Sequence, residues 1–348
     1  MIKKGNKIIF YGFPFFHHKG TMGGYHHIKE YLTYDIIIDL DSEKYLIDVT
    51  LNKNFTFKVV KKLYLTIFKR IGFLQLIRCS ILAIFKKNYT FHFIYPENTY
   101  AWLHNIKNQT NKIACTFHQP PNFYANSKRW QNIIKSIDLI IVLNKSDVIF
   151  FKSITMRDNV YYLPHGVNTS FFKFDINIRK ENRVIMVGNW LRNFELARKL
   201  FLKINKNFPN IIIDIVVNNE NKFHFTGLNV KLHTNISDLD LKILYQKSKI
   251  AFFPLYDFTA NNSMLEAMAC GTSILVATDK KYKDLDLPNE FLSIVPNDDF
   301  LVYEKFTDLF FSNKNDYFYY LAMSKYCNEN YSWNIVAKNT KIILNSIP

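Results

Sequence analysis

The sequence is poor in cysteine, with four among 348 residues, and the four form no recognisable motif. Cys79, Cys115, Cys270 and Cys327 lie far apart, with no CxxC pair and no Cys/His cluster at the spacing of a metal site. The pattern gives no indication of a zinc site. A reducing cytosol is the compartment that it favours.

Long uninterrupted apolar runs are also missing. The most apolar segment, residues 63–85, is interrupted by Lys69, Arg70 and Arg78, and three charges at mid-membrane are too costly for a spanning helix. Residues 1–10 place lysines ahead of a short apolar run and contain no small-residue cleavage site. We therefore expect a first strand there and no signal peptide.

Acidic residues are scarce relative to basic ones. The chain has 45 Lys and Arg against 29 Asp and Glu, which gives a formal net charge of +16. This excess favours an anionic partner such as a membrane surface, nucleic acid or a phosphorylated substrate. Part of it reflects a general abundance of Lys, Asn, Ile and Phe that we attribute to the source genome. No nucleic-acid-reading motif accompanies the charge, so we expect no nucleic-acid partner.

A chain of 348 residues exceeds one ordinary core, so we expect two domains. The order of apolar and polar segments predicts that both are of the α/β class. Short apolar runs alternate with helix-length segments, as in doubly wound parallel sheets. Strands are expected at 7–13, 34–40, 45–49, 90–95, 112–117, 136–143, 160–163, 183–187, 211–217, 230–234, 250–255 and 273–277. Helices are expected at 26–32, 55–87 with a break at Gly72, 194–207, 238–247, 262–271, 303–311, 317–327 and 333–345, with another capped by Asn144, Lys145 and Ser146. The polar residues 175–182 are expected to link the domains.

The segment 55–87 has a basic face. Lys58, Lys62 and Lys69 share one side of the predicted helix, while large apolar residues such as Leu63 and Phe68 occupy the rest. This arrangement is typical of a helix that lies on a membrane surface. A solvated basic face over a packed core explains the same pattern, because runs of charge usually face water. The sequence leaves both interpretations open.

Two stretches of the first half place ligand-binding residue types after strands, where open α/β sheets bind ligands. Gly23 and Gly24 would let the backbone approach a ligand closely, although their spacing is not GxGxxG and a plain turn is an equal alternative. His118 follows the strand 112–117. A lone histidine is usually structural, but at this position its imidazole can donate to a developing anion or to a substrate hydroxyl.

The second half contains a stronger candidate site. The apolar strand 250–255 leads into a polar loop and a small-residue helix that begins at Asn262 or Ser263 and closes at Gly271. The first N–H groups of a helix lack partners within it, and the helix dipole adds positive charge, so this N-terminus suits a diphosphate. Arg192 follows the strand 183–187 and starts a helix, where a cation is mildly unfavourable. Its position therefore favours a role as a bidentate phosphate ligand.

Four stretches together resemble the retaining GT-B glycosyltransferases of the glycogen-synthase and mannosyltransferase type, glycosyltransferase family four. Leu163-Pro-His-Gly-Val-Asn-Thr-Ser-Phe-Phe172 is similar to the family's interdomain P-N/H-G-V-D-x-x-x-F segment, and Val187-Gly-Asn-Trp-Leu-Arg192 to its V-G-x-x-x-x-K/R diphosphate loop. Leu265-Glu-Ala-Met-Ala-Cys-Gly271 matches the nucleotide-binding L-E-A-M-A-C-G closely. Tyr331-Ser-Trp333 is similar to the y/f-S-W that begins a final helix returning to the first domain.

The resemblance implies an α/β protein of GT-B fold, in which two Rossmann-like doubly wound domains face each other across a cleft. The implied parts are an acceptor domain at 1–172, a linker at 173–182, a sugar-nucleotide domain at 183–328 and a returning C-terminal helix at 329–348. The implied reaction moves a sugar from a nucleotide-diphosphate sugar to a glycan or lipid-linked acceptor, with retention of configuration, in surface polysaccharide or glycoconjugate synthesis. A cytoplasmic enzyme is implied, with the anionic inner face of the membrane as a candidate peripheral partner.

The resemblance also assigns roles to residues. Glu266 is implied to accept hydrogen bonds from ribose hydroxyls, Arg192 to bind the diphosphate, and His118 to face the transferred sugar. The implied donor-binding set is Gly23, Gly24, Gly188, Asn189, Asp257, Asn261, Asn262, Ser263, Met264 and Glu266. No metal or other cofactor is expected, because arginine, lysine and helix N-termini neutralise the leaving group.

Some positions depart from the family pattern. Many members carry an acidic residue eight positions before the ribose-binding glutamate, but residue 258 is Phe, and the lysine that often follows the diphosphate arginine is absent. Asp257, or the amides of Asn261 and Asn262, are the alternatives for the sugar contact. Asn168 also replaces the usual Asp.

The sequence also supports alternatives to catalysis, both for Glu266 and for the whole protein. The spacing Ser263-Met-Leu-Glu266 fits a capping box, which gives Glu266 a purely structural alternative. Phe258 in place of an acid motivates a second hypothesis for the whole protein. In that hypothesis the chain is a catalytically weak sugar-nucleotide or glycan-binding partner in a membrane-associated assembly.

Overall fold

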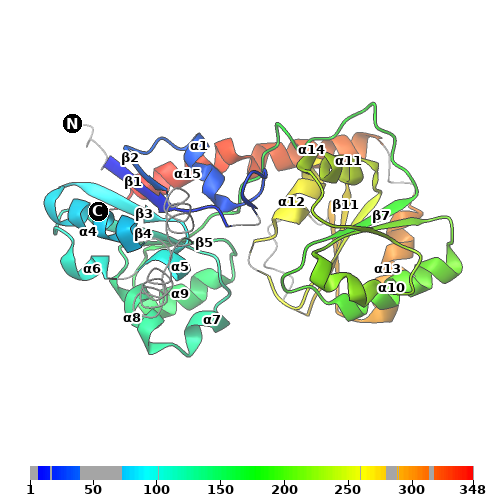
Figure 1. Cartoon of the computed structure of the whole chain (residues 1–348), viewed down its shortest axis with the longest axis horizontal. Coiled ribbons are helices and arrows are strands. Elements are labelled where there is room, and N and C mark those ends of the chain that lie inside the picture. The colour runs from blue at the N-terminus through cyan, green and yellow to red at the C-terminus, as the bar shows by residue number, and fades with distance from the viewer. Residues whose placement is uncertain are drawn as a thin grey trace, which may run out of the picture. The chain divides into compact units, whose positions relative to one another are not determined.

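The computed structural model describes residues 7–15, 18–39, 73–100, 102–258, 260–279, 288, 290–312 and 317–347. They form two compact units, each built on a parallel sheet (Figure 1). The first unit holds the described residues within Met1–Gly20, Gly24–Pro164 and Val336–Pro348, and the second holds Thr21–Gly23 and those within His165–Ile335. The contact grouping thus divides the chain after Pro164 and places the segment 165–172 with the second unit.

The first sheet has the strand order β2-β1-β3-β4-β5-β6, and each neighbouring pair is parallel. Its strands are β1 (Lys7–Gly12), β2 (Ile36–Asp39), β3 (Tyr89–Phe93), β4 (Lys112–Phe117), β5 (Leu139–Val142) and β6 (Val160–Tyr162). The chain moves outward from β1 to β2 and then returns to place β3 on the other side of β1. The point between β1 and β3 is therefore the topological switch point, where such sheets bind ligands.

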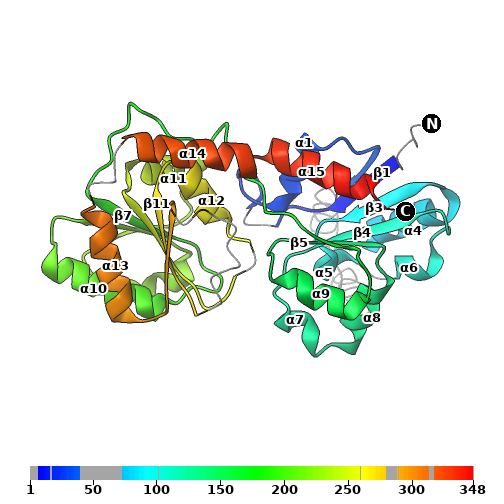
Figure 2. The same ribbon diagram turned by 180° about the vertical axis from the view of Figure 1, so that it is seen from behind.

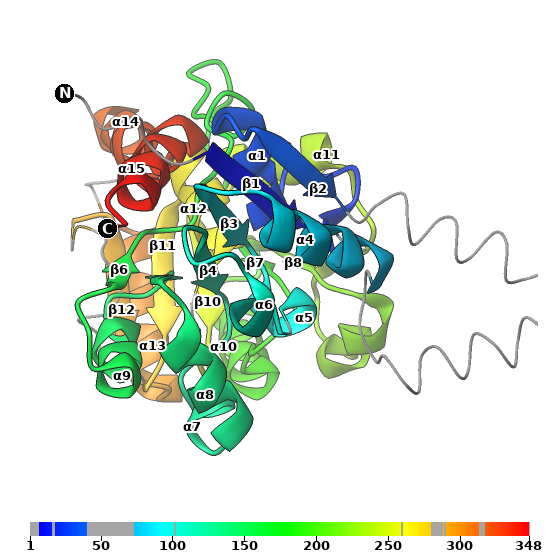
Figure 3. The ribbon, with the colours of Figure 1, turned by 90° about the vertical axis from the view of Figure 1, so that its left-hand side faces the viewer.

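Short helices surround this sheet. They are η2 (Tyr25–His27), α1 (Ile28–Tyr31), α4 (Phe73–Phe85), α5 (Pro96–Thr99), α6 (Leu103–Ile106), α7 (Asn122–Ala125), α8 (Lys128–Ser136) and α9 (Asp147–Thr155). In Figure 3, α4 lies beside β2 and α6, which it contacts. The expected cap of α9 was wrong, because the Ser146 side chain, at the N-cap, accepts no capping bond. Backbone hydrogen bonds form the start of the helix instead: the N–H groups of Asp147 and Val148 donate to the carbonyls of Asn144 and Lys145.

The second sheet has the order β12-β11-β10-β7-β8-β9, again with every neighbouring pair parallel. Its strands are β7 (Arg183–Val187), β8 (Ile212–Val216), β9 (Lys231–His233), β10 (Ile250–Pro254), β11 (Ser273–Ala277) and β12 (Leu292–Val295). The central strands are almost continuously apolar, as expected for strands covered on both faces. Here the switch point lies between β7 and β10.

Two hydrophobic clusters cover the faces of the second sheet. One packs against α11 (Asp238–Lys247), α12 (Asn262–Ala269) and α14 (Tyr317–Tyr331). The other packs against α10 (Phe194–Asn207) and α13 (Asp299–Phe310), with η3 (Asn219–Phe225) at its edge. Figure 2 shows the two groups of helices on opposite sides of the sheet.

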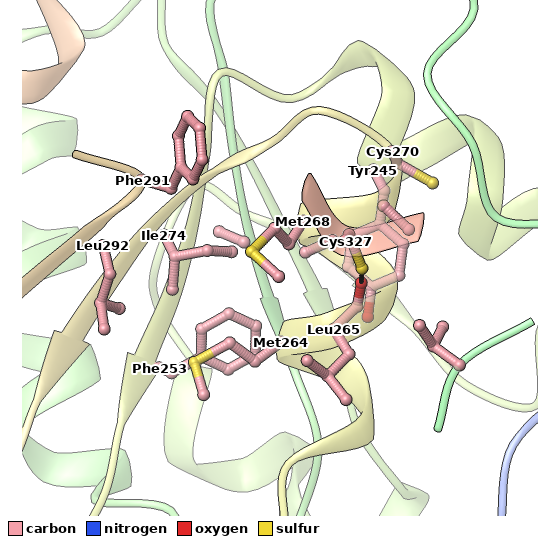
Figure 4. Packing of buried hydrophobic residues seen from close by; sticks show 14 of the residues in the cluster. Tyr245, Phe253, Met264, Leu265, Met268, Cys270, Ile274, Phe291, Leu292 and Cys327 are labelled. Atoms are coloured by element: carbon pink, nitrogen blue, oxygen red, sulfur yellow. Dashed lines mark hydrogen bonds between the residues drawn. The ribbon is translucent and has the colours of Figure 1, made fainter. Parts of the chain in front are cut away.

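Helix α12 is held by the first of these clusters. Met264 and Met268 point into it beside Phe253 and Ile274, and the Cys327 thiol donates to the Leu265 carbonyl at 3.5 Å (Figure 4). The four cysteines are free and buried, so they are packing residues here. This packing sets the position of α12 and of its N-cap residue, Asn261.

Two segments that carried the family resemblance lie side by side in the second unit. The Val167 N–H donates to the Tyr331 carbonyl at 2.9 Å, and the Trp333 N–H donates to the Val167 carbonyl at 3.2 Å. A Cβ on Gly166 would lie 2.3 Å from the Trp333 ring, so only glycine fits against the indole. This pairing anchors the start of α15 (Trp333–Asn345), whose buried residues Val336, Ala337, Thr340 and Leu344 form one stripe in the first unit.

The predicted α/β class is confirmed, and β4, β7, β11, α10, α11 and α15 have the predicted bounds. Helix α13 begins at Asp299 and not at residue 303, because Asp298 caps it by accepting from the N–H groups of Phe300 and Leu301. Strand β12 and helix α8 were not predicted. The predicted strand 45–49 and residues 55–72 of the predicted helix lie outside the described residues. No helix of the described ranges is long and apolar enough to cross a membrane.

A buried ionic network braces the second sheet. Asp214, fully buried on β8, binds His233 Nε2 at 2.7 Å and pairs with the guanidinium of Arg183. Arg183 Nη2 also pairs with Glu181 Oε2 at 2.8 Å. The network ties β7, β8 and β9 together through side chains as well as through the backbone.

Asp214→Ala should lower the free energy of unfolding by about 2–4 kcal/mol, measured by chemical denaturation. The substitution leaves the buried Arg183 with Glu181 alone, so the loss should lie somewhat below the roughly 3–5 kcal/mol of a fully uncompensated charge. Glu195→Ala, which removes an exposed pair with Lys199, is the control and should change stability by at most about 0.5 kcal/mol. Equal stability of the two variants would contradict the importance of this network.

Candidate functional site

The two anion-binding elements predicted from the sequence meet at the switch point of the second sheet. Arg192 follows β7, and the N-terminus of α12 follows β10, which is the neighbour of β7. Residues 192 and 255 also form an antiparallel bridge, and the Tyr256 N–H donates to the Leu191 carbonyl at 3.0 Å. The loops after the two strands are therefore joined at the place where the fold favours ligand binding.

Arg192 is a cation whose described hydrogen-bond partners are all neutral. Its Nε and Nη2 donate to the Val187 carbonyl at 3.1 and 3.0 Å, and Nη1 donates to the Trp190 carbonyl at 3.3 Å. Burial lowers the pKa of the guanidinium to about 10, against a smaller opposite effect of Tyr245, so Arg192 is charged at neutral pH. No carboxylate in the described part of the chain pairs with it. Such a cation is well suited to bind an anion.

The loop between β7 and Arg192 has a backbone that glycine makes possible. Gly188 has a φ of +111°, and a Cβ there would lie 2.6 Å from Arg192 Nη2. Asn189 braces the loop, because its Oδ1 accepts from the Asn218 N–H and from Asn221 Nδ2, each at 2.8 Å. The predicted donor-binding residues Gly188 and Asn189 therefore shape the loop that positions Arg192.

Asn261 joins the two anion-binding elements. It is the N-cap of α12, and its Oδ1 accepts from the Met264 N–H and from Arg192 Nη2, both at 3.4 Å. Its Nδ2 is buried and has no hydrogen-bond partner among the described residues. A charged guanidinium, a helix N-terminus and an unused amide donor thus lie together, which is an arrangement that attracts anions.

The capping-box alternative for Glu266 was wrong. It required Ser263 as the N-cap, whereas the helix begins after Asn261, which places Glu266 beyond the capping turn. The Glu266 carboxyl is buried, with 7% of the residue exposed, and the Tyr245 hydroxyl donates to its Oε2 at 3.4 Å. Burial, aided by the charge of Asp238, raises the pKa of Glu266 to about 8. A buried carboxyl with one long hydrogen bond has room to accept more.

The remaining predicted donor-binding residues of α12 and its loop differ in their surroundings. The Met264 side chain is in the core, and Ser263 is half-buried in the first turn of α12. Asn262, the first residue of α12, is half-buried. Asp257 Oδ1 accepts from the Phe258 N–H at 2.7 Å. Phe258 is only 4% exposed and belongs to the hydrophobic cluster, so position 258 is used for packing.

The glycine loop is split between the units. Thr21–Gly23 groups with the second unit, where the Met22 N–H donates to Asp238 Oδ2 at 2.6 Å. The Gly23 N–H donates to Thr21 Oγ1 at 3.3 Å. Gly24 has a φ of +101°, and a Cβ there would lie 2.8 Å from His26 Nδ1. The group that the Gly24 backbone approaches closely is therefore the His26 side chain of the same chain.

His118 follows β4 in the first unit. Its imidazole packs against Tyr95, with ring centroids 4.5 Å apart, and against Tyr25 at 5.1 Å. Its backbone N–H donates to Glu97 Oε1 at 2.6 Å. The sequence patterns did not predict a role for Glu97, Tyr95 or Tyr245. Tyr95 and Glu97 lie just beyond β3, where a search for polar residues after strands would have found them. Over the ranges that the structure describes, no three His, Cys, Asp or Glu residues form a metal-binding group.

Comparison with known proteins establishes the fold. No protein-family model matches the chain, and no curated protein matches it in sequence. Solved structures do match, and they confirm that the chain has the predicted GT-B fold of two Rossmann-like domains. A glycosyltransferase from Rickettsia africae ESF-5 matches with a TM-score of 0.67 and 14% identity, over 99% of both chains.

Two further neighbours cover nearly the whole chain. Anabaena Alr3699/HepE, in complex with UDP and glucose, has a TM-score of 0.65 and 12% identity over 98% of this chain and 100% of its own. The N-terminal domain of Candida albicans trehalose-6-phosphate phosphatase has a TM-score of 0.66 and 12% identity over 100% of this chain and 98% of its own. Some matched chains are longer, and this chain covers only 58%, 59% and 60% of three of them.

Glu266→Gln should change how stability depends on pH. The folded-state pKa of about 8 lies above the ordinary 4.5, so the stabilising contribution of Glu266 is full below about pH 4.5 and is lost as the pH rises through 8. Between about pH 5 and about pH 8, the wild-type melting temperature should fall by several degrees relative to that of E266Q. Glu304→Gln on α13 is the control at an exposed position. Parallel pH curves for wild type and E266Q would contradict the burial argument.

Proposed function

We propose that the protein is a glycosyltransferase that uses a nucleotide-diphosphate sugar as its donor. The junction at Asn261 carries the proposal, because it links the charged Arg192 to the N-terminus of α12 at the switch point of the second sheet. The diphosphate binds Arg192, the Asn261 amide and the first turn of α12. Glu266, one turn further along the helix, accepts hydrogen bonds from the ribose hydroxyls.

The neighbouring structures support this choice of substrate. One neighbour is a glycosyltransferase, and another, HepE, binds UDP and glucose. The same fold also occurs in a domain of a protein named as a phosphatase. The fold therefore makes sugar-nucleotide chemistry a natural proposal, and the site residues carry the argument for this chain.

The reaction that we propose retains the anomeric configuration. The bond from the anomeric carbon to the diphosphate oxygen breaks first, and the acceptor hydroxyl attacks the same face. The acceptor proton passes to the departing diphosphate, which serves as the base. Arg192 and the dipole of α12 stabilise the charge on that leaving group, so no step of the proposal needs a metal. The acceptor is a glycan or a lipid-linked oligosaccharide in the synthesis of surface polysaccharide or glycoconjugates.

Arg192→Ala and Glu266→Ala should impair transfer in different ways, as measured by steady-state kinetics with the donor that binds. R192A should lower kcat about 10²–10³-fold, because it removes a cation at the developing charge. E266A should raise the donor KM by about tenfold or more, because ribose contacts are similar in the ground and transition states.

Arg157→Ala is the matched control. Arg157 also donates to backbone carbonyls. It precedes β6, however, which is an edge strand of the first sheet, whereas Arg192 follows β7 of the second sheet. R157A should leave kcat and KM within about twofold. Near-wild-type turnover of both R192A and E266A would overturn the proposed site. A thermal-shift panel of UDP-, GDP-, dTDP- and ADP-sugars identifies the donor to use.

A catalytically weak binding partner is the second candidate function. It is favoured by Phe258, which is in the core where many family members have a sugar-contacting acid. Under this proposal the protein binds a sugar nucleotide or glycan within a membrane-associated assembly. Donor binding in the thermal-shift panel, without transfer to any glycan or lipid-linked acceptor pool, would favour it over the first.

We also propose that the first unit lies on the anionic inner face of a membrane. Helix α4 exposes Ile77, Ile81, Ile84 and Phe85, which recur at helical spacing on one face. The partly exposed Trp102 also contacts this helix, because its Nε1 donates to Ser80 Oγ at 3.3 Å. Among the described residues, Arg78, Lys86 and Lys87 are exposed cations on or just beyond this helix. An apolar face with basic flanks is the arrangement of an interfacial helix. The lysines that first suggested it lie outside the described residues.

Ile81→Glu combined with Phe85→Glu should weaken binding to vesicles that contain phosphatidylglycerol by about tenfold or more, measured by sedimentation. The two side chains are 51% and 76% exposed, so the protein should stay folded. Ile149→Glu on α9, at a position that is 77% exposed, is the control and should bind like wild type. Equal binding of all three proteins, or none by wild type, would contradict a membrane role for α4.

A further inference from the structure

Glu97 is a buried titratable residue that the proposed mechanism leaves unused. It lies at the start of α5, immediately beyond β3, and β3 flanks the switch point of the first sheet. It therefore occupies the edge of the sheet at which this class of fold binds ligands. Neither the sequence pattern nor the proposed donor site gives it a role.

One oxygen of the Glu97 carboxyl makes three hydrogen bonds. Oε1 accepts from the backbone N–H of His118 at 2.6 Å, from that of Gln119 at 3.1 Å, and from the Tyr124 hydroxyl. These donors come from the turn after β4 and from α7. A single carboxyl oxygen thus fixes the turn that carries His118.

The other oxygen, Oε2, is buried and has no hydrogen-bond partner within the described residues. Burial raises the pKa of Glu97, while the hydrogen bonds from Tyr124 and the two backbone N–H groups oppose the rise. Burying a carboxyl is costly unless its bonds compensate. Here most of the compensation comes from the His118 turn and Tyr124, and the backbone of Glu97 itself adds to it.

The imidazole of His118 is held by a second set of contacts. Tyr95 packs at a centroid distance of 4.5 Å, and Tyr25 packs edge-on at 5.1 Å with an interplanar angle of 79°. These tyrosines hold each other, because the Tyr25 N–H donates to the Tyr95 hydroxyl at 2.9 Å. Glu97 fixes the backbone of His118, and the tyrosines fix the ring.

We propose that Glu97 is a positioning residue of sugar transfer, acting by holding the His118 turn so that the imidazole keeps one place at the sheet edge. The inference rests on the proposed function and on the expected contact of His118 with the transferred sugar. A catalytic group must be held to a fraction of an ångström, and a displacement of about 1 Å can lower a rate about 100-fold. Three bonds to one oxygen supply that restraint.

Asp138, which lies just before β5, provides a matched control at the other end of β4. Its Oδ2 accepts from the Ile113 N–H at 2.8 Å and lies 3.5 Å from Lys107 Nζ. Asp138 therefore holds the beginning of β4 much as Glu97 holds its end. A residue that is only structural should behave in the same way in both places.

The experiment compares Glu97→Ala, Glu97→Gln and Asp138→Ala in the full chain. E97A should lower kcat about 10–100-fold and leave the donor KM within about threefold. E97Q should recover most of the rate, because its amide oxygen still accepts from the turn. D138A should lower the melting temperature without changing kcat. Equal losses of kcat in E97A and D138A, or no loss in E97A, would overturn the proposal.

A second measurement does not depend on activity. The ring protons of His118, assigned by their loss in His118→Gln, should shift in the NMR spectrum of E97A because the imidazole moves relative to Tyr95 and Tyr25. They should stay unshifted in D138A. An unmoved signal in E97A would overturn the positioning role even if kcat falls. A wild-type protein that transfers no sugar would overturn the proposed function, while this measurement still tests the position of His118.

Should E97A not fold, Glu97→Asp takes its place. Aspartate keeps the charge but draws the oxygen back from the turn by one methylene. It should lose rate and shift the His118 signal more than E97Q does. The reverse order would show that charge, and not position, is what Glu97 supplies, and would overturn the proposal.

Discussion

The side-chain oxygen of Asn261 is the atom on which the candidate site depends. It accepts from the first turn of α12 and from the guanidinium of Arg192, so it joins groups from two neighbouring crossovers of one sheet. The sheet makes this possible, because β7 and β10 are adjacent although many residues separate them in the chain. The hydrophobic cluster beneath α12 then keeps the helix from moving away.

Local patterns were enough to predict much of the fold. Apolar runs between polar loops gave β7 and β11 their bounds, Pro209 marked the end of α10, and amphipathic spacing gave the bounds of α11. The predicted cap of α9 was wrong because three polar residues before a helix do not determine which groups bond its first turn. Either their side chains or the backbone can do so. Strand β12 is short, and three of its four residues are only partly buried, so it leaves little periodic signal.

The site was predictable in part, for a physical reason. The segments that contain Arg192, Asn261 and Glu266 each consist of a strand, a loop and a helix in sequence order. This local pattern is visible in the sequence alone. Tyr245 and Glu97 each contact a residue 21 positions away in the chain, and only the fold brings each of them to that partner. Phe258 shows the converse, since the sequence raised the question of a missing acid and the packing around the ring supplies the reason.

The buried carboxyl of Glu266 would make the proposed nucleotide binding an acid–base reaction as well. With a pKa near 8, Glu266 holds a proton in most molecules at neutral pH. Hydroxyls that donate to a carboxyl favour its ionised form. A nucleotide bound as proposed would therefore release this proton to the solvent. Each binding event would acidify the solution slightly. Protonation of Glu266 would in turn oppose nucleotide binding, so a lower pH would weaken it.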